Sequence, residues 1–473
     1  MTILKRNFVA IIALILFSTT LVSTQQVQFS AASTACVGYQ GGVNTITITC
    51  DASFLDVVQA ISDPAILEQE VQGGQYILHA NLEVADGVTF QMTSNGDNLR
   101  YLKLAGANGI IVYGKILIDG VKITSWDVSE DDIIQQDMNG TISRAYIQFD
   151  ASEGAQILNS EFGYLGYDEP GRRGFDLYGG GGPSHDMVIR GSTFHDMWFA
   201  FYSNAAYNIV VDGSEYHHNI RYALDPHTAT YNMNITNNYL HHNRYGAICS
   251  DDCYNILIEG NRAHHNTDAG IVFSRNMTNS IARNNHVYNA TTGISLSESP
   301  NNQIYNNTIE RAADEGILLF NPEVIDDGFT EGNMVYDNVI SSSEDGIRAT
   351  NSHDNILENN TFDDIESSKY LLSLYSNILI RGQNFDDVLI AAGDPATENL
   401  VEIVDSGIIE VTEEAIDDEE EDGNEDDEEE EETVANTYNT DIERYSKILS
   451  DGDSIRVKSR RPSGLRKTTV RIN

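Results

Sequence analysis

The segment from Tyr222 to His227 carries residue types that could do chemistry, because it holds a tyrosine, a carboxylate and an imidazole. Asp225 and His227 are two positions apart, so on an extended strand both side chains project from the same face. A carboxylate beside an imidazole fixes its tautomer and raises its basicity, as a general base near neutral pH requires. Pro226 removes a backbone donor, which predicts a local distortion of the strand. The alternative is a surface turn in which Asp225 and His227 only cap backbone groups.

A repeat of about 23 residues must position this segment. A small residue recurs at spacings of 23, 23, 24, 23, 23 and 30, and the last step contains an insertion around 321–328. The small residues are Ala200, Ala223, Gly246, Gly270, Gly293, Gly316 and Gly346. This period is too short for two packed helices but fits one coil of a parallel β-helix. We therefore predict an all-β solenoid.

Strand periodicity predicts an inner and an outer face for each coil. Side chains one and three positions after the small residue share one face, and those two and four positions after it share the other. The first face is apolar and reads as core, with Phe201, Leu224, Ala247, Ile271, Ile294, Ile317 and Ile347 in successive coils. Asp225 and His227 fall on the outer face. Tyr222 is out of phase with them and reaches the same groove only if the strand bends at its start.

Two further sets of residues recur with the coil. Asparagines at 238, 261, 284 and 307 are each 23 residues apart, which predicts a structural stack because asparagine tolerates left-handed turns and hydrogen-bonds its neighbours. His-His-Asn runs begin at His217, His241 and His264, and we expect these rings to stack at one corner. A metal cluster is the alternative, disfavoured because ligands should converge whereas stacked coils spread them along an axis.

The chain divides into six predicted regions. Lys5 and Arg6 precede an apolar run from Phe8 to Leu16, which predicts a signal peptide at 1–25 and a secreted, extracellular or cell-surface protein; an uncleaved anchor is the alternative. A cap region at 26–75 contains an amphipathic helix around Phe54 to Ile61. The solenoid follows at 76–380, then a C-terminal cap at 381–412, an acidic linker at 413–436 and a basic tail at 437–473.

Charge narrows the range of partners. The formal net charge is −44, which argues against nucleic acid as a partner. Sixteen of the twenty residues from Glu413 to Glu432 are acidic, and such a block should repel itself and stay disordered. The tail after Asp453 is basic, and it could bind an anionic glycan or fold back on the acidic block. No segment other than the signal is predicted to cross a membrane, and the sequence leaves the oligomeric state open.

Cysteines and sequons also suit an exported protein. Cys36 with Cys50 and Cys249 with Cys253 are sequence-local pairs, which favours two disulfides over a metal site. Six Asn-X-Ser/Thr sequons would suit a glycosylated surface. They begin at Asn139, Asn234, Asn276, Asn289, Asn306 and Asn359.

The segment from Phe199 to His227, FAFYSNAAYNIVVDGSEYHHNIRYALDPH, closely resembles the bacterial mannuronan C5-epimerases of alginate biosynthesis. These proteins carry a Tyr-Gly-Ile-Asp-Pro-His or Tyr-Gly-Phe-Asp-Pro-His motif on a right-handed parallel β-helix, and the similarity extends over roughly 75–360. The resemblance implies a right-handed solenoid and a base at His227 that acts on the C5 hydrogen of a uronate. It further implies proton transfer by Tyr222, with Asp225 supporting the histidine or contacting the sugar.

Such a reaction also needs a positive group beside the base, because the sugar C–H becomes acidic only when its carboxylate is neutralised. Arg275, in GIVFSRN, matches the family's second arginine, and Arg221, Arg244 and Arg173 are the other candidates. The first arginine of the periplasmic members is replaced here by Asp251. Calcium-dependent members lack it too, so a bound Ca²⁺ held by Asp251 and Asp252 could take over its role; no other cofactor is expected.

The same intermediate permits two outcomes, epimerisation or β-elimination by a polysaccharide lyase. A pectinase-type hydrolase ranks third, since only Asp251 and Asp252 are adjacent acids in the groove coils. A non-catalytic, glycan-binding cell-surface solenoid is the hypothesis from a different class. We expect poly(mannuronate) C5-epimerase activity, with an anionic polyuronate as partner.

Overall fold

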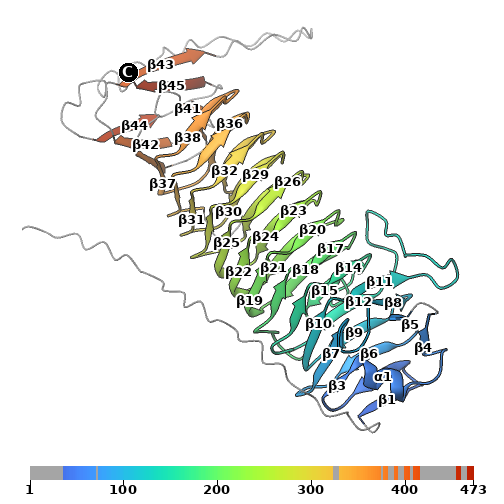
Figure 1. The fold of residues 1–473 in the computed structure, drawn as a ribbon. Coiled ribbons are helices and arrows are strands. Elements are labelled where there is room, and N and C mark those ends of the chain that lie inside the picture. The colour runs from blue at the N-terminus through green and yellow to red at the C-terminus, as the bar shows by residue number, and fades with distance from the viewer. Residues whose placement is uncertain are drawn as a thin grey trace, which may run out of the picture.

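The computed structural model describes residues 36–70, 73–322, 330–373 and 377–381, and five further strands towards the C-terminus. Within these ranges the chain is almost entirely β-structure, and Figure 1 shows its strands rising as a long staircase of coils. The predicted signal peptide and the acidic residues at 416–436 lie outside the described residues. No helix in the described ranges is long and apolar enough to cross a membrane.

Three sheets run the length of the staircase, and nearly every strand pairs in parallel with its counterpart one coil later. Sheet A contains the candidate site. Its 17 strands are β1 (Val37–Gln40), β2 (Thr45–Ile48), β6 (Asn81–Val84), β9 (Gly109–Val112), β12 (Tyr146–Phe149), β15 (Gly174–Leu177), β18 (Phe199–Asn204), β21 (Tyr222–His227), β24 (Tyr245–Ser250), β27 (Ala269–Ser274), β30 (Thr292–Ser297), β33 (Glu315–Phe320), β36 (Asp345–Thr350), β39 (Ser368–Ser373), β41 (Val388–Ala391), β43 (Ile409–Ala415) and β45 (Arg466–Ile472).

The other two sheets close each coil. Sheet B consists of β3 (Ala52–Ser53), β7 (Thr89–Thr93), β10 (Lys115–Asp119), β13 (Gln156–Leu158), β16 (Val188–Arg190), β19 (Tyr207–Asp212), β22 (Tyr231–Thr236), β25 (Tyr254–Glu259), β28 (Ile281–Arg283), β31 (Gln303–Tyr305), β34 (Met334–Tyr336), β37 (Asn355–Glu358), β40 (Asn377–Arg381), β42 (Asn399–Val404) and β44 (Ser454–Ser459). Sheet C consists of β4 (Leu67–Gln69), β5 (Gln75–Leu78), β8 (Tyr101–Ala105), β11 (Lys122–Trp126), β14 (Glu161–Gly163), β17 (Thr193–His195), β20 (Glu215–His217), β23 (Tyr239–His241), β26 (Arg262–His264), β29 (His286–Tyr288), β32 (Thr308–Glu310), β35 (Val339–Ser341) and β38 (Thr361–Asp363).

The predicted inner face is the core of the solenoid. Leu224, Ile271 and Ile294 occupy equivalent positions in their coils, and none of them has exposed surface. Residues of this kind form one continuous apolar cluster that extends from Val37 to Ile380. Because each coil covers its neighbour, the apolar surface that a single coil could not bury is removed from water by stacking.

The predicted N-terminal helix is α1, Phe54–Ala60, and Figure 1 places it at the N-terminal end of the staircase. Ser53 caps it through a capping box with Asp56, which satisfies free N–H groups of the first turn. Phe54 is fully buried and packs edge-on against Tyr76 with ring centroids 5.1 Å apart. The helix therefore joins the core at this end of the solenoid.

Strands from the basic tail pair with the last strands of the solenoid. β44 runs antiparallel to β42, and β45 runs antiparallel to both β41 and β43. The register places Glu410 opposite Arg471 and Glu414 opposite Lys467. The basic tail thus folds back onto β43, whose last residues are the first of the acidic block. Folding back on the acidic block was one of the two alternatives that the charge of the tail left open.

The expected disulfides are half right. Cys36 and Cys50 are joined. Cys249 and Cys253 are both free and buried, so the second predicted disulfide was wrong. Both cysteines belong to the core cluster, Cys249 from β24 and Cys253 from the turn after it, and the Cys253 thiol donates to the carbonyls of Ser250 and Pro226, at 3.3 and 3.5 Å.

A buried asparagine stack runs from coil to coil, as predicted, but one of its members was misassigned. The stack contains Asn238, Asn261, Asn285, Asn307, Asn338 and Asn360, and each Oδ1 accepts from the backbone N–H and Nδ2 of the asparagine before it. Asn284 is instead exposed with φ 55°, and its amide donates to Glu259. The coil between Asn261 and Asn285 is one residue longer than a fixed period of 23 allows.

This difference predicts unequal costs for two adjacent substitutions. Asn285→Ala should lower the free energy of unfolding by about 2 to 4 kcal/mol, because it leaves buried partners such as the Ile258 carbonyl without a bond. Asn284→Gly, which keeps the left-handed backbone, should cost well under about 1 kcal/mol. Denaturant unfolding followed by circular dichroism compares them. Equal losses would contradict the assignment of the stack.

Candidate active site

The segment Tyr222–His227 forms β21 in sheet A, between β18 and β24. Leu224 belongs to the core, so alternation directs Asp225 and His227 to the outer wall. Tyr202 of β18 lies in register with Asp225. Pro226 has no N–H to donate, and its carbonyl accepts the bond from the Cys253 thiol described above. The outer wall of sheet A at β21 is therefore where the chemistry-bearing side chains gather.

The imidazole of His227 is held by three neighbours. Its Nδ1 lies 2.7 Å from Thr228 Oγ1, and its Nε2 lies 3.2 Å from Asp251 Oδ2 and 3.4 Å from an Nη atom of Arg275. Asp251 also pairs with Arg275, whose Nε is 2.5 Å from Oδ1. His227, Asp251 and Arg275 thus form a closed triad of contacts, in which one carboxylate bridges the imidazole and the guanidinium.

The carboxylate at the ring of His227 is Asp251, so the expectation that Asp225 would support the imidazole was wrong. Residues two apart on a strand have Cα atoms about 6.6 Å apart and parallel side chains, a gap that the short Asp225 side chain does not close. Asp251 follows β24 by one residue and turns back, with φ 61°.

Asp225 has a different environment, because it lies on the outer wall yet is only 1% exposed. Its Oδ1 has no hydrogen-bond partner among the described residues. Burial raises the pKa of Asp225 well above its usual range, although Arg173 and Arg275 oppose the shift. Burial therefore favours the neutral carboxyl form of Asp225, which can donate an O–H to a ligand.

A second cation lies towards β15. The Arg173 guanidinium lies over the Tyr202 ring, 4.1 Å from its centroid, and its Nη1 is 3.4 Å from Asp176 Oδ2. Burial raises the pKa of Asp176 to about 7. The Tyr202 ring is in turn 5.3 Å from the ring of His227. Arg173 and Arg275 thus approach the base from coils on its two sides.

The side chain of Tyr222 reaches the outer wall, although strict alternation would point it away from the face of Asp225 and His227. Its ring meets Phe199 and Tyr245 edge-on at 5.0 and 5.2 Å. It packs with Tyr245 against the outward-facing Ile248 and Val272. Burial raises the pKa of the Tyr222 phenol, and the nearby Asp225 adds to the shift, so the hydroxyl keeps its proton near neutral pH.

The remaining two predicted arginines lie at the Tyr222 end of the wall, each with another partner. Arg221 stacks on Trp198, with its guanidinium 4.8 Å from the ring centroid. Arg244 pairs with Asp268 at 2.7 Å. Of the four arginines considered from the sequence, Arg275 and Arg173 are the two that act on both Asp225 and His227.

His227 is poised as a base rather than as a cation. Burial lowers the pKa of its imidazole, Arg275 and Arg173 lower it further, and Asp251 opposes them. A neutral imidazole between two guanidinium groups can accept a proton from a carbon acid whose carboxylate those groups neutralise. The arrangement therefore suits proton abstraction beside a carboxylate.

Comparison with known proteins supports the fold. The family described as right handed beta helix region matches residues 173–326. Mannuronan C5-epimerase of Pseudomonas aeruginosa is 28% identical over 183 residues, which are 37% of this chain and 33% of that protein. Mannuronan C5-epimerase AlgG of Azotobacter vinelandii is 29% identical over 188 residues, 37% of this chain and 35% of that protein.

The chain is similar in sequence to the mannuronan C5-epimerases over this stretch. The crystal structure of the periplasmic alginate epimerase AlgG superposes with a TM-score of 0.58 at 22% identity, covering 71% of this chain and 85% of that one. This likeness establishes the predicted right-handed parallel β-helix. The chain spans about a third of the length of the curated epimerases that it matches.

The site contains two residues whose contacts with His227 the sequence analysis missed, Thr228 and Asp251. Thr228, Asp251 and Arg275 follow consecutive strands of sheet A, and all three have positive φ. The equal spacing of 24 residues from His227 to Asp251 and from Asp251 to Arg275 was the available signal. It places the three side chains on successive coils, so Asp251 had to lie between a base and a cation.

Asp251 and Asp252, the two carboxylates considered for calcium, each have a protein partner. Asp251 forms an ion pair with Arg275, and Asp252 accepts a hydrogen bond from the Asn276 side chain at 2.6 Å. Among the described residues, the group of three side chains that brings metal-binding atoms together is Glu153, His185 and Asp186. Calcium binding by Asp251 and Asp252 stays a prediction.

The triad predicts opposite shifts for two substitutions. Asp251→Asn should lower the pKa of His227, because Asp251 raises it, and Arg275→Gln should raise that pKa, because the guanidinium lowers it. Histidine-selective NMR titration measures both. Asp252→Asn, at the adjacent left-handed position, is the control and should leave the titration unchanged. Unchanged curves in all three variants would contradict the contacts of the triad.

Proposed function

We propose that this protein is a polysaccharide C5-epimerase that converts mannuronate to guluronate residues within a polymer. The observation that carries the proposal is the neutral His227 on the outer wall between Arg173 and Arg275, in a chain related to mannuronan C5-epimerases. An anionic polyuronate is the partner that these cations suit. The net charge of −44 would repel such a polymer elsewhere on the surface, so binding depends on this local positive field.

In the proposed reaction, Arg275 and Arg173 bind the uronate carboxylate. Neutralising that carboxylate acidifies the C5 hydrogen, and His227 takes the proton while the electron pair moves into an enediolate. Tyr222, which keeps its proton, then donates from the other side of the sugar ring and restores the C5–H bond with inverted configuration. Proton exchange with water afterwards returns His227 and Tyr222 to their starting states.

Asp225 supports the same intermediate as a neutral acid. A buried carboxyl with a free oxygen can donate a hydrogen bond to the developing oxyanion without adding negative charge beside it. An ionised carboxylate there would repel the substrate. The burial that raises the pKa of Asp225 therefore serves the reaction.

Asp251 controls access to the base. With Thr228 at Nδ1 and Asp251 at Nε2, both imidazole nitrogens of His227 are occupied before substrate binds. The substrate carboxylate competes with Asp251 for Arg275. With the ring N–H on Nδ1 and donated to Thr228 Oγ1, the departure of Asp251 leaves the Nε2 lone pair free to take the C5 proton. The residue that replaces the family's first arginine thus acts as a gate.

The proposed site of action is outside the cytoplasm. The predicted signal at the N-terminus and the Cys36–Cys50 disulfide both suit an oxidising compartment. The related AlgG whose structure superposes on this chain is periplasmic. Location in the periplasm or beyond the cell is consistent with each of these observations.

Hydrogen exchange at C5 tests the reaction. Incubation with poly-mannuronate in D₂O should place deuterium at C5 and create guluronate, both visible by NMR. His227→Gln should reduce exchange by at least about 100-fold, because the general base is lost. His79→Gln, at a histidine paired with Glu68 in the first coils, is the control and should retain exchange.

The alternatives give different readouts in the same experiment. A lyase would yield an unsaturated product that absorbs in the ultraviolet, and a binding protein would retain the polymer without exchange. The proposal would be overturned if protein shown to be folded by circular dichroism placed no deuterium at C5 of any polyuronate tested.

If Asp251 acts as a gate, removing its negative charge should strengthen substrate binding. Asp251→Asn should lower the KM for poly-mannuronate by about three- to tenfold, the worth of one partly exposed ion pair of about 1 kcal/mol. Initial rates measured by NMR across polymer concentrations give KM and kcat separately. Asp252→Asn is the matched control, and a raised KM in Asp251→Asn would contradict gating.

A further inference from the structure

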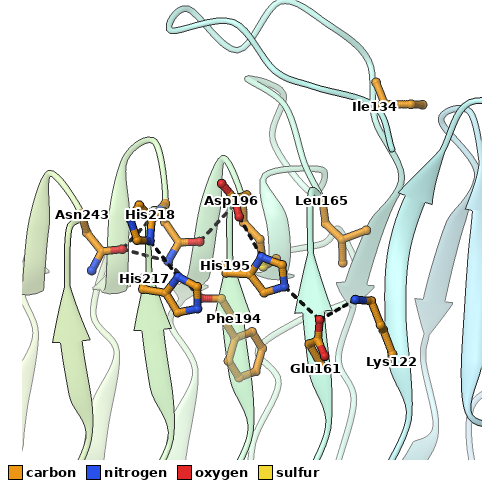
Figure 2. A network of polar contacts seen from close by, with 12 residues as sticks. Lys122, Ile134, Glu161, Leu165, Phe194, His195, Asp196, His217, His218 and Asn243 are labelled. Atoms are coloured by element: carbon orange, nitrogen blue, oxygen red, sulfur yellow. Dashed lines mark hydrogen bonds and ion pairs between the residues drawn. The ribbon is translucent and has the colours of Figure 1, made fainter. Parts of the chain in front are cut away.

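A double column of histidines lies along sheet C, away from the β21 wall. The inner column is His217, His241 and His264, at the ends of β20, β23 and β26, and the outer column is His218, His242 and His265. We call these six residues the histidine ladder. Figure 2 shows its first rung, His217 with His218, beside His195 of the preceding coil.

The rings of each column stack along the solenoid axis. Centroids are 5.2 and 5.1 Å apart in the inner column and 4.9 and 5.1 Å apart in the outer column. The planes are within 9° of parallel. The predicted stacking is therefore confirmed, and along the axis the rings are too far apart for one ion to join two coils with short bonds.

Within each rung, however, the two rings converge. The Nδ1 atoms lie 2.8 Å apart in His217–His218, 2.8 Å in His241–His242 and 2.6 Å in His264–His265. Two nitrogens bound to one ion at about 2.0–2.1 Å and at right angles are about 2.9 Å apart. The sequence argument against a metal considered only the axial spread of the coils and did not foresee this convergence.

His241–His242 is the best-supported rung. The Nε2 of His241 lies 3.0 Å from Glu215 Oε1, so this ring N–H is held by a carboxylate and the Nδ1 lone pair faces His242. Histidine ligands of metals commonly have such an outer carboxylate partner. His242 is exposed, so an ion can enter from solvent and the second nitrogen can hand its proton to water.

The next rung is less suited. The His264 Nε2 lies 2.7 Å from the Tyr239 hydroxyl, which is a comparable outer partner. His265 is held differently, because Arg311 donates to Asn289 Oδ1 and so turns the Asn289 amide nitrogen towards His265 Nε2, at 3.2 Å. That nitrogen must then accept, which keeps the proton on Nδ1, where a metal would bind.

The ladder also has ends at which other residues replace histidine. One coil before the ladder, the Nδ1 of His195 lies 2.8 Å from Asp196 Oδ2 and its Nε2 contacts Glu161. Glu161 also pairs with Lys122, as Figure 2 shows. One coil after it, Tyr288 stacks on His264 and Asn289 occupies the outer position. The paired imidazoles are thus confined to three adjacent coils.

We propose that the histidine ladder is a binding site for a divalent transition metal, with His241 and His242 as its principal ligands. Neutral imidazoles select ions such as Cu²⁺, Ni²⁺ and Zn²⁺ over Ca²⁺ and Mg²⁺, with Cu²⁺ bound most tightly. Water completes the coordination sphere on the exposed side. The flanking rungs provide weaker copies of the same two-nitrogen site.

Untagged full-length protein titrated with Cu²⁺, followed by calorimetry and by electron paramagnetic resonance, tests the proposal. The expected spectrum shows coordination by two nitrogens, and excess Ca²⁺ should not displace the metal. His242→Asn should weaken the tightest site at least about tenfold. The variant should fold, because asparagine holds the same left-handed outer position at Asn289.

His185→Asn is the matched control, since it removes one histidine from the separate group of Glu153, His185 and Asp186. It should leave the tightest site unchanged. Loss of binding in His185→Asn with full binding in His242→Asn would overturn the proposal, as would the absence of any nitrogen-coordinated copper in the unsubstituted protein.

Discussion

Coil-to-coil register is the constraint on which the rest of this structure depends. Nearly every described strand of the three sheets pairs in parallel with its counterpart one coil away, and the buried asparagine stack repeats that bonding at a corner. Because the core is continuous and each coil is covered only by its neighbours, a side chain has a fixed position relative to residues about 23 positions away in either direction. Both proposed sites exploit this: one brings cations from two coils before and two coils after β21 to the base at His227, and the other places imidazole pairs on adjacent coils.

Charge compensation explains how a strongly acidic protein could act on an acidic polymer. Arg173 and Arg275 come from coils on opposite sides of His227, and each already has a carboxylate partner, Asp176 and Asp251 respectively. The two partners differ in environment. Asp176 is fully buried with a pKa raised to about 7, whereas Asp251 is partly exposed and can be displaced by an incoming carboxylate. A site built this way holds its cations in place before substrate arrives, at the cost of some binding energy.

The periodicity of the sequence predicted which strand residues face the core, but it did not predict the contacts made by residues at the turns between strands. Alternation assigned Leu224 to the core and His227 to the outer wall, and the capping helix followed from its apolar spacing. A fixed count of 23 misplaced Asn284 by one residue, because coil length varies at the turns. The same variability hid Asp251, which reaches His227 from a left-handed turn. Pairings across a turn depend on backbone geometry that residue types alone do not specify.

The measurement that tests the central claim most directly is a crystal structure of the protein with a mannuronate oligomer bound. The account predicts a sugar carboxylate on Arg275 in place of Asp251, and a C5 atom about 3–3.5 Å from His227 Nε2. An oligomer bound to another wall of the solenoid, or bound at β21 with the Asp251–Arg275 pair intact and C5 remote from the imidazole, would contradict it.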